Sequence, residues 1–437
     1  MRILETSPPF TICFRVVCLN LEIWGVKITQ RLAAWIAFLA LLILIGVFGF
    51  SRTLLEGHWW TGLQVPSMGG AVWGLYVTNY IFLIGASAGG FIIAASAHIF
   101  NVEKYKSIST LATLIALIII LLPPIFIAAD LGRPDRLLHV AYPTPNLRSP
   151  LFYVLLTLTL YIILLTLEGW FSMRRRLASK RRWLTLGFDD LSEYSKHKDE
   201  QILRVLSLVG LPLAVSVHSV TGWIFGLMKS RPFWLSPLMA PIFLSSALVS
   251  GVALLIFVCI VVRRFAGFKI EQDTLSDLAR LLFMMIPIDI FFLLIEVLTV
   301  AYAHEPTDMK PLLFLLLGSN APLFWFEIIA GALIPFVILA FPNYRRSTRV
   351  LTLTSLLILV GIWLKRWNLL MAGTLFTHEW FGWAEYPLGS YTPTWVEWSV
   401  MAGIYGGAAL LFTLVIKFLP VEEEKMVIHA PAGVEVE

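Results

Sequence analysis

Charged residues are scarce in this sequence. They make up 14% of the 437 residues, whereas 58% of the residues are hydrophobic. Because soluble domains average about 25% charged residues, this composition excludes an ordinary soluble domain and predicts an integral membrane protein. The net charge of +5 comes from lysines and arginines in short polar segments between apolar runs. These residues form no single basic patch, so we expect no nucleic-acid partner.

Cysteine and histidine are too few for several kinds of metal site. The three cysteines are Cys13, Cys18 and Cys259, whereas an iron–sulfur cluster needs about four thiolates. Only His98 and His218 fall within apolar runs, near opposite faces of the membrane, whereas a transmembrane b-haem commonly takes two axial histidines. We therefore predict that this chain holds no iron–sulfur cluster, no haem and no other metal.

Long apolar runs fill most of the chain. A membrane-spanning helix needs about 20 predominantly apolar residues, and the runs of that length predict an all-α integral membrane protein with about ten transmembrane helices. The ninth run is the least regular, because its end carries Lys365 and Arg366. The predicted spans are 32–50, 71–100, 108–129, 150–171, 203–227, 237–262, 276–303, 322–341, 348–368 and 394–418.

Lysine and arginine lie mostly on one side of these spans. With the N-terminus inside, the inner segments hold 23 of them and the outer segments hold 9, leaving out Arg280 within the seventh span. Because the excess of positive charge lies in cytoplasmic loops, we expect a protein of the cell membrane with both termini in the cytoplasm. The inner clusters 174–176 and 180–182 are expected to bind anionic lipid headgroups. The aromatic outer segment 369–393 is expected to lie at the membrane interface.

A short pattern occurs twice in the apolar part of the chain. Gly85 and Gly89 lie on one face of a helix in the stretch 80–91, so another backbone can approach closely. The same frame returns in the stretch 242–251, at an offset of 161 residues. We interpret the two stretches as equivalent helices of a duplicated bundle, although tight helix packing alone would also account for the glycines. The predicted division is a cytoplasmic segment 1–31, a transmembrane domain 32–418 with repeat halves at approximately 71–227 and 237–368, and a cytoplasmic tail 419–437.

Polar residues inside the spans are the candidates for function, because burying them in a membrane is costly. Five of them lie at one level in the outer half of five different spans, which predicts a polar pocket on the outer side. His218 and Glu296 lie deepest in this group. For Asn79 a hydrogen bond to a neighbouring helix is an equal alternative, and Glu327 lies near a helix start, where a carboxylate suits the helix dipole. The five are Asn79, Asp130, His218, Glu296 and Glu327, with Asp289 nearer mid-membrane and His98 and Glu168 near the inner ends.

The outer segment 129–136 combines turn residues with charges. Gly132 and Pro134 impose a turn. Asp130 can form fork-like ion pairs with Arg133 and Arg136. On its own this pattern predicts a structural lock on the turn.

Several of these motifs resemble the NrfD/PsrC family, the quinone-interacting membrane subunits of respiratory oxidoreductases. The most specific part is Asp130-Leu-Gly-Arg-Pro-Asp-Arg136 followed by Asn146-Leu-Arg-Ser149-Pro150. The segments 216–223 and 233–237 are similar to the ten-helix branch, which includes subunits of alternative complex III, hydrogenase-2-type complexes and sulfur-metabolism complexes. The resemblance covers roughly residues 70–345.

The resemblance implies two four-helix bundles, no haem in this subunit, and a quinone site near the side where an iron–sulfur subunit docks. Asn79 matches the polar residue before the glycine-rich face, and His218 matches the histidine of the fifth helix. The branch often has an acidic residue shortly after the tryptophan of that helix, whereas this chain reads Trp223-Ile-Phe-Gly. This departure argues against a proton-pumping route like that proposed for alternative complex III.

Together these observations predict the quinone-binding membrane subunit of a multi-subunit oxidoreductase. We expect His218 to exchange a proton with a quinone oxygen, Asn79 to donate a hydrogen bond, and Glu296 or Asp130 to relay protons. The loop of Arg133 would brace the docking surface for a ferredoxin-type iron–sulfur subunit, and a catalytic subunit of molybdopterin or hydrogenase type would act on the external substrate. The alternatives are a proton-coupled transporter, whose intramembrane carboxylates would look similar, and a passive membrane anchor.

Overall fold

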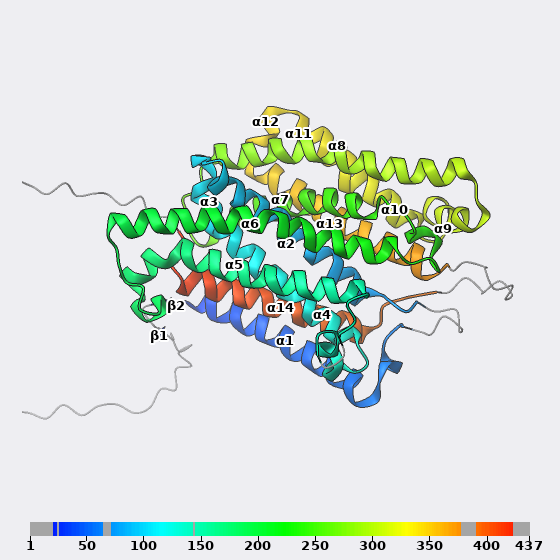
Figure 1. Cartoon of the computed structure of the whole chain (residues 1–437), viewed down its shortest axis with the longest axis horizontal. Helices are drawn as coiled ribbons and strands as arrows, with labels where there is room; N and C mark the ends of the chain where they lie inside the picture. Colours follow the sequence, from blue (N-terminus) through cyan, green and yellow to red (C-terminus); the bar gives the residue numbers. More distant parts are fainter. Residues whose placement is uncertain (1–20, 24–25, 64–70, 143–144, 377–389, 423–437) are drawn as a thin grey trace, which may run out of the picture.

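A computed structural model describes residues 21–23, 26–63, 71–142, 145–376 and 390–422 (Figure 1). Within these ranges it contains 10 helical segments long and apolar enough to cross a membrane, which confirms the predicted all-α architecture. The spans are α1 (Gln30–Glu56), α2 (Leu75–Ile99), α3 (Glu103–Ile120) with α4 (Leu122–Asp130), α5 (Pro150–Lys180), α6 (Glu193–Gly226), α7 (Met239–Phe265), α8 (Gln272–Ala303), α10 (Ala321–Ile328) with η6 (Ile329–Leu333) and α11 (Ile334–Ala340), α13 (Thr348–Thr374) and α14 (Trp395–Phe418).

Shorter elements connect the spans. A two-stranded antiparallel ribbon precedes α1. We call the end of the bundle that carries η3 and α9 the predicted outer end; α9 lies at the right of Figure 1. The connecting elements are β1 (Leu21–Ile23), β2 (Val26–Ile28), η1 (His58–Trp60), η3 (Pro134–Val140), η4 (Arg182–Thr185), η5 (Pro232–Trp234), α9 (Pro306–Leu316) and α12 (Pro342–Arg345).

The two central helices are α2 and α7, which are the most deeply buried spans and pack against each other. A Cβ atom on Gly89 would lie 2.3 Å from the Ala247 carbonyl oxygen, and one on Gly251 would lie 2.3 Å from the Gly89 Cα. The predicted small-residue face is therefore the contact between the two helices that carry the repeated pattern. The duplication itself stays a prediction.

The first and last spans form a separate pair. Figure 1 shows α1 and α14 side by side along one edge of the bundle, with α8 and α11 at the opposite edge. Gly46 of α1 meets Gly403 of α14, where a Cβ on either residue would lie 2.7 Å from the other's Cα. The rest of α1 is largely exposed on the outside of the molecule, as expected for a helix that faces lipid.

Two spans are interrupted by prolines or irregular turns. The third span breaks at Leu121, and α4 restarts with Pro123 in its first turn, where the missing N–H is tolerated. The eighth span contains the π-helical segment η6, followed by Pro335 in the first turn of α11. The helices of these two spans are thus interrupted, although the apolar runs that predict them are continuous.

The ninth span differs from its prediction. Helix α13 continues to Thr374, beyond the expected end at residue 368, so Lys365 and Arg366 lie within the helix. Their side chains are buried, at 6% and 1% exposure. The nine outer cations counted above included both residues, which was wrong, and leaving them out increases the difference in positive charge between the two sides. They are retained inside because Asp289, the Phe243 carbonyl and the Ser246 hydroxyl face them.

The expectation that Arg174 binds lipid headgroups is also wrong. Its side chain is 3% exposed and holds Asp199 of α6 with three hydrogen bonds, from Nε to Oδ1 and to Oδ2 at 3.0 Å each and from Nη2 to Oδ2 at 2.6 Å. It also donates to the Phe188 carbonyl at 2.7 Å. Because the planar guanidinium is already held by the Asp199 carboxylate in a fork-like geometry, it is not available to a lipid headgroup. The pair also ties α5 to α6.

Some predicted segments lie outside the described residues. They are residues 1–20 with Cys13 and Cys18, the aromatic segment 377–389, and the tail 423–437.

Candidate functional site

Asn79 lies fully buried in α2 with its amide satisfied by protein groups. Its Nδ2 donates to the Leu75 carbonyl at 2.8 Å. Its Oδ1 accepts from Trp363 Nε1 at 3.1 Å and from the Tyr405 hydroxyl at 2.9 Å. These bonds join α2 to α13 and α14, and they favour the helix-bonding alternative for Asn79.

His218 is buried in α6 beside the central helix α2. Its Nε2 lies 3.5 Å from the Gly85 carbonyl oxygen, and its Nδ1 has no hydrogen-bond partner among the described residues. The histidine lines none of the three cavities described below. Its predicted role in proton exchange stays a prediction.

The turn after α4 is locked differently from the prediction. Arg133 pairs with Asp135, with Nε–Oδ1 at 3.0 Å and Nη2–Oδ2 at 2.9 Å. Because the guanidinium donates these hydrogen bonds, the pKa of the Asp135 carboxyl lies below its usual range. Asp130 takes no part in this pair, and its Oδ1 is buried without a partner among the described residues. The exposed Arg133–Asp135 fork remains compatible with a bracing role at a docking surface.

Glu296 lies in the C-terminal half of α8, toward the predicted outer end. Its Oε2 accepts a hydrogen bond from the Ser236 hydroxyl at 2.8 Å, just before α7 begins. Of the predicted site residues Asn79, Asp130, His218 and Glu296, only Glu296 lines the cavity described next. The other three bond to, or lie against, other elements, so the described contacts do not assemble the four into one pocket.

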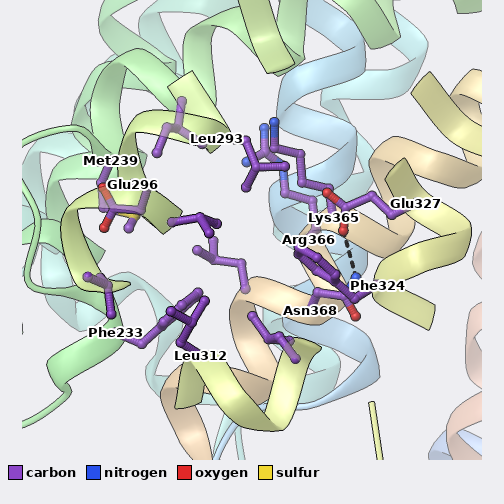
Figure 2. Close-up of a pocket in the computed structure, with 15 residues that line it drawn as sticks. Phe233, Met239, Leu293, Glu296, Leu312, Phe324, Glu327, Lys365, Arg366 and Asn368 are labelled. Carbon is purple, nitrogen blue, oxygen red and sulfur yellow. Dashed lines mark hydrogen bonds between the residues drawn. The ribbon is translucent and has the colours of Figure 1, made fainter. Parts of the chain in front are cut away.

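An apolar cavity with a volume of about 40 Å³ lies at the predicted outer end, between α7, α8, α9, α10 and α13. Figure 2 shows Glu296 on one side of this space and Glu327, Lys365, Arg366 and Asn368 on the opposite side. Apolar side chains, including Leu293, Leu312 and Phe324, form the walls between them. The cavity therefore offers a hydrophobic slot with polar groups at two ends.

The polar end on α13 contains a buried ion pair. Lys365 Nζ lies 2.7 Å from Asp289 Oδ1, and Ser245 donates to the same oxygen at 2.8 Å. Asn368 Nδ2 donates to Glu327 Oε2 at 2.6 Å, and Asn320 donates to Asn368 in turn at 2.6 Å. These bonds fix the carboxyl groups against α13.

Arg366 is the least satisfied member of this group. Its guanidinium lies over the Phe243 ring, 4.2 Å from the centroid, and one nitrogen donates to Ser246. Its Nε and Nη1 are buried without hydrogen-bond partners among the described residues. Because a buried donor without a partner costs free energy, this side of the cavity is suited to an acceptor oxygen of a ligand.

Two cations and three carboxyl groups share this region. They are Lys365 and Arg366, against Asp289, Glu296 and Glu327. The group is electrically neutral when the three carboxyl groups hold one proton between them.

A second cavity, with a volume of about 430 Å³, lies between the end of α6 and the start of α7. Met239 lines both cavities, and Ser236, which also lines the second one, bonds to Glu296 in the first. Trp223 and Leu235 of the second cavity are 47% and 45% exposed on the outside of the bundle. The two cavities are thus neighbours, and exposed side chains line the second one.

Comparison with known proteins matches residues 64–378 to the family model described as polysulphide reductase, NrfD. This match covers most of the chain. The chain belongs to the NrfD family. It is therefore a multi-pass membrane protein of a family of reductase membrane subunits, as the motifs around Asp130 and Asn146 indicate.

Three relatives illustrate the family. A Halobacterium salinarum protein, provisionally named as a membrane subunit of a dimethyl sulfoxide reductase, is 32% identical over 89% of this chain and 91% of its own. A subunit of the selenate reductase of Mesobacillus selenatarsenatis is 30% identical over 90% of this chain and 96% of its own. The integral membrane subunit of a menaquinone reductase from Nitratidesulfovibrio vulgaris is 24% identical over 90% and 92%.

Sequence reasoning missed three polar residues of the cavity that Glu296 lines, namely Lys365, Arg366 and Asn368. They lie within one turn of α13. This turn is at the end of an apolar run, where charged residues usually mark a membrane boundary. The signal that could have found them is the apolar sequence Leu369–Gly373, which continues the run beyond the charges.

Proposed function

We propose that this chain is the quinone-interacting membrane subunit of a multi-subunit reductase complex. The observation that carries the proposal is the apolar cavity with Glu296 at one end and the unpaired buried nitrogens of Arg366 at the other. A quinone ring needs an apolar slot and a polar partner near each of its two oxygens. The cavity volume of about 40 Å³ is below the range of about 300–1,000 Å³ for small-molecule pockets, so the quinone ring would enter by moving the apolar side chains of the walls apart.

The residues of the cavity would have different roles in binding the quinone and in moving its protons. Arg366 and Asn368 would orient one ring oxygen by donating hydrogen bonds. Glu296 would hold or release a proton beside the other oxygen, with Ser236 fixing its carboxyl group. The second cavity at Met239 would admit the apolar tail from the lipid phase. The quinone itself supplies two-electron, two-proton redox chemistry.

Electrons would pass between the quinone and a partner subunit. The described residues contain no group of three His, Cys, Asp or Glu side chains arranged to hold a metal ion. We infer a ferredoxin-type iron–sulfur subunit as the electron carrier and a catalytic subunit of molybdopterin or hydrogenase type. The names of the dimethyl sulfoxide, selenate and menaquinone reductase relatives support this arrangement.

The test uses the assembled complex in membranes and compares Glu296→Gln with Glu305→Gln, an exposed carboxylate before α9. We expect Glu296→Gln to lower quinone-linked turnover by about a hundredfold, the lower end of the usual contribution of general acid–base catalysis. The control should keep normal turnover. Reduction of the substrate by an artificial dye that feeds the partner subunit should be unchanged in both.

His218→Leu distinguishes this cavity from the site beside α2 that the sequence favours. Loss of quinone turnover in His218→Leu but not in Glu296→Gln would place the quinone beside α2 and overturn the cavity assignment. Normal quinone-linked turnover in both variants would contradict both site assignments. An unaltered complex with dye-driven turnover but no quinone-linked turnover would contradict the quinone function and leave the passive anchor or the transporter.

A further inference from the structure

A third cavity lies at the end of the bundle opposite the proposed quinone cavity, among the ends of α2, α3, α5 and α6. Its volume is about 660 Å³. The side chains in its lining that can donate hydrogen bonds to an anion include five from three helices and a turn: His98, Asn101, Lys106, Gln201 and Arg204. This cavity takes no part in the function proposed above.

The charge of the lining favours an anion. Arg204 has no ion pair within the described residues, and Lys106 pairs only with Glu103, one turn away on the exposed surface, at 2.7 Å. Such exposed pairs contribute little free energy, so the ammonium group remains available. Among the described lining residues the one carboxyl group is Glu200, and it lies 3.7 Å from His197 Nδ1.

The surroundings of Arg204 show which kind of anion fits. Leu208 is one helical turn further into the membrane on the same face of α6 and is 60% exposed. Its neighbours Val205 and Val209 are 60% and 56% exposed. On α5, Leu167 is 44% exposed. A soluble anion would gain nothing from these apolar side chains, whereas acyl chains would cover them.

We propose that this cavity binds the phosphate of an anionic phospholipid headgroup, with the acyl chains lying along the exposed faces of α5 and α6. Arg204 and Lys106 hold the phosphate, and Asn101 and Gln201 donate to its remaining oxygens. Basic pockets between helices at the cytoplasmic membrane surface bind anionic headgroups in this way. Arg174 does not contribute to this site, because it is held by Asp199.

The test measures phosphatidylglycerol binding by native mass spectrometry of the delipidated full-length chain. Arg204→Gln is compared with Arg264→Gln, which removes the same charge from the same end of the bundle but lies outside the cavity. One cation at a membrane surface contributes about a fivefold change in affinity. We therefore expect Arg204→Gln to bind the lipid about fivefold more weakly, and Arg264→Gln to bind it like the unaltered chain. Lys106→Gln should repeat the loss independently.

Two further ligands identify the source of the phosphate. Phosphatidylcholine tests the need for net negative charge, and glycerol-1-phosphate offers the headgroup without acyl chains. Equal loss in both arginine variants, or none in either, would overturn the site. Phosphatidylcholine binding as tightly as phosphatidylglycerol would overturn the anion preference. Glycerol-1-phosphate competing at the same concentration as the lipid would show a soluble-anion site and overturn the lipid assignment.

Discussion

At the scale of single residues, the ion pair of Lys365 with Asp289 differs most from what the sequence predicts. Both side chains are less than a tenth exposed, and their charged atoms lie 2.7 Å apart. Buried ion pairs contribute little net stability relative to apolar residues, but a charge that loses its partner is costly. The pair therefore adds little stability itself, whereas removing either of its members should be costly.

This leads to a prediction for single and double variants. Lys365→Met should lower the free energy of unfolding by about 3–5 kcal/mol, because it leaves the Asp289 carboxylate without its cation. Lys365→Met combined with Asp289→Leu should recover most of this loss. Thermal unfolding of the purified chain in detergent measures both.

The control for this cycle is the exposed pair of Lys104 with Asp277, 2.9 Å apart at the bundle end. Lys104→Met should leave the unfolding temperature almost unchanged, since surface pairs are screened by water. A double variant no more stable than Lys365→Met alone would contradict the assigned role of the pair.

The sequence could indicate which residues are polar inside the membrane, but not which of them meet. Depth along a helix follows from position in the run, so Glu296 was correctly expected in the C-terminal half of its span. The direction in which a side chain points around the helix axis depends on how the helices pack. Packing places Asn79 against Trp363 and Tyr405 instead of beside Glu296. Lys365 and Arg366 were not expected in the cavity, because charged residues usually end a membrane span. Here the buried partner Asp289 allows Lys365 to lie within the helix.

At the scale of helices, the contact of α2 with α7 depends on the absence of side chains at the crossing. The sequence predicts such a face from its small residues, and its repeated frame relates α2 to α7. It does not show that these two helices cross at Gly89 and Gly251, because helix rotation is set by all neighbours together.

Substitution at this crossing gives a second prediction. Gly89→Ala should destabilise the chain by at least about 1–3 kcal/mol, because the new methyl group would overlap the Ala247 carbonyl. Gly90→Ala is the matched control, since its Cβ would lie 4.0 Å from the nearest atom, the Gly251 carbonyl oxygen. Unfolding temperature and yield of the folded chain measure the difference. Equal behaviour of the two variants would show that the close approach is not needed.

At the scale of the whole molecule, the charge distribution predicts its orientation. The segment around Tyr142 and the segment around Ser179 lie at opposite ends of α5. A reporter active only outside the cytoplasm should respond when fused after Tyr142 and be silent when fused after Ser179, because the cationic end stays in the cytoplasm. The same signal at both positions would refute the ten-span topology, and the reverse pair of signals would refute the orientation.

The second prediction at this scale concerns haem. His98 lies at one end of α2, and His218 packs beside Gly85 within the bundle. A relative from Escherichia coli, 25% identical, is provisionally named a b-type cytochrome subunit of a hydrogenase, which gives the opposite expectation. We expect the purified chain to show no b-type absorption band. A stoichiometric Soret band with the character of two histidine ligands would contradict this.

The pairing of α1 with α14 has a consequence for the time course of synthesis. The first span completes its close contact at Gly46 only with Gly403 of the last span. A ribosome adds about 5–20 residues per second, so the roughly 340 residues between Glu56 and Trp395 take about 20–70 seconds. During that interval lipid or the insertion machinery must cover the glycine face of α1. A ribosome that stalls before Trp395 therefore leaves a nearly complete protein whose first helix has not yet met its partner.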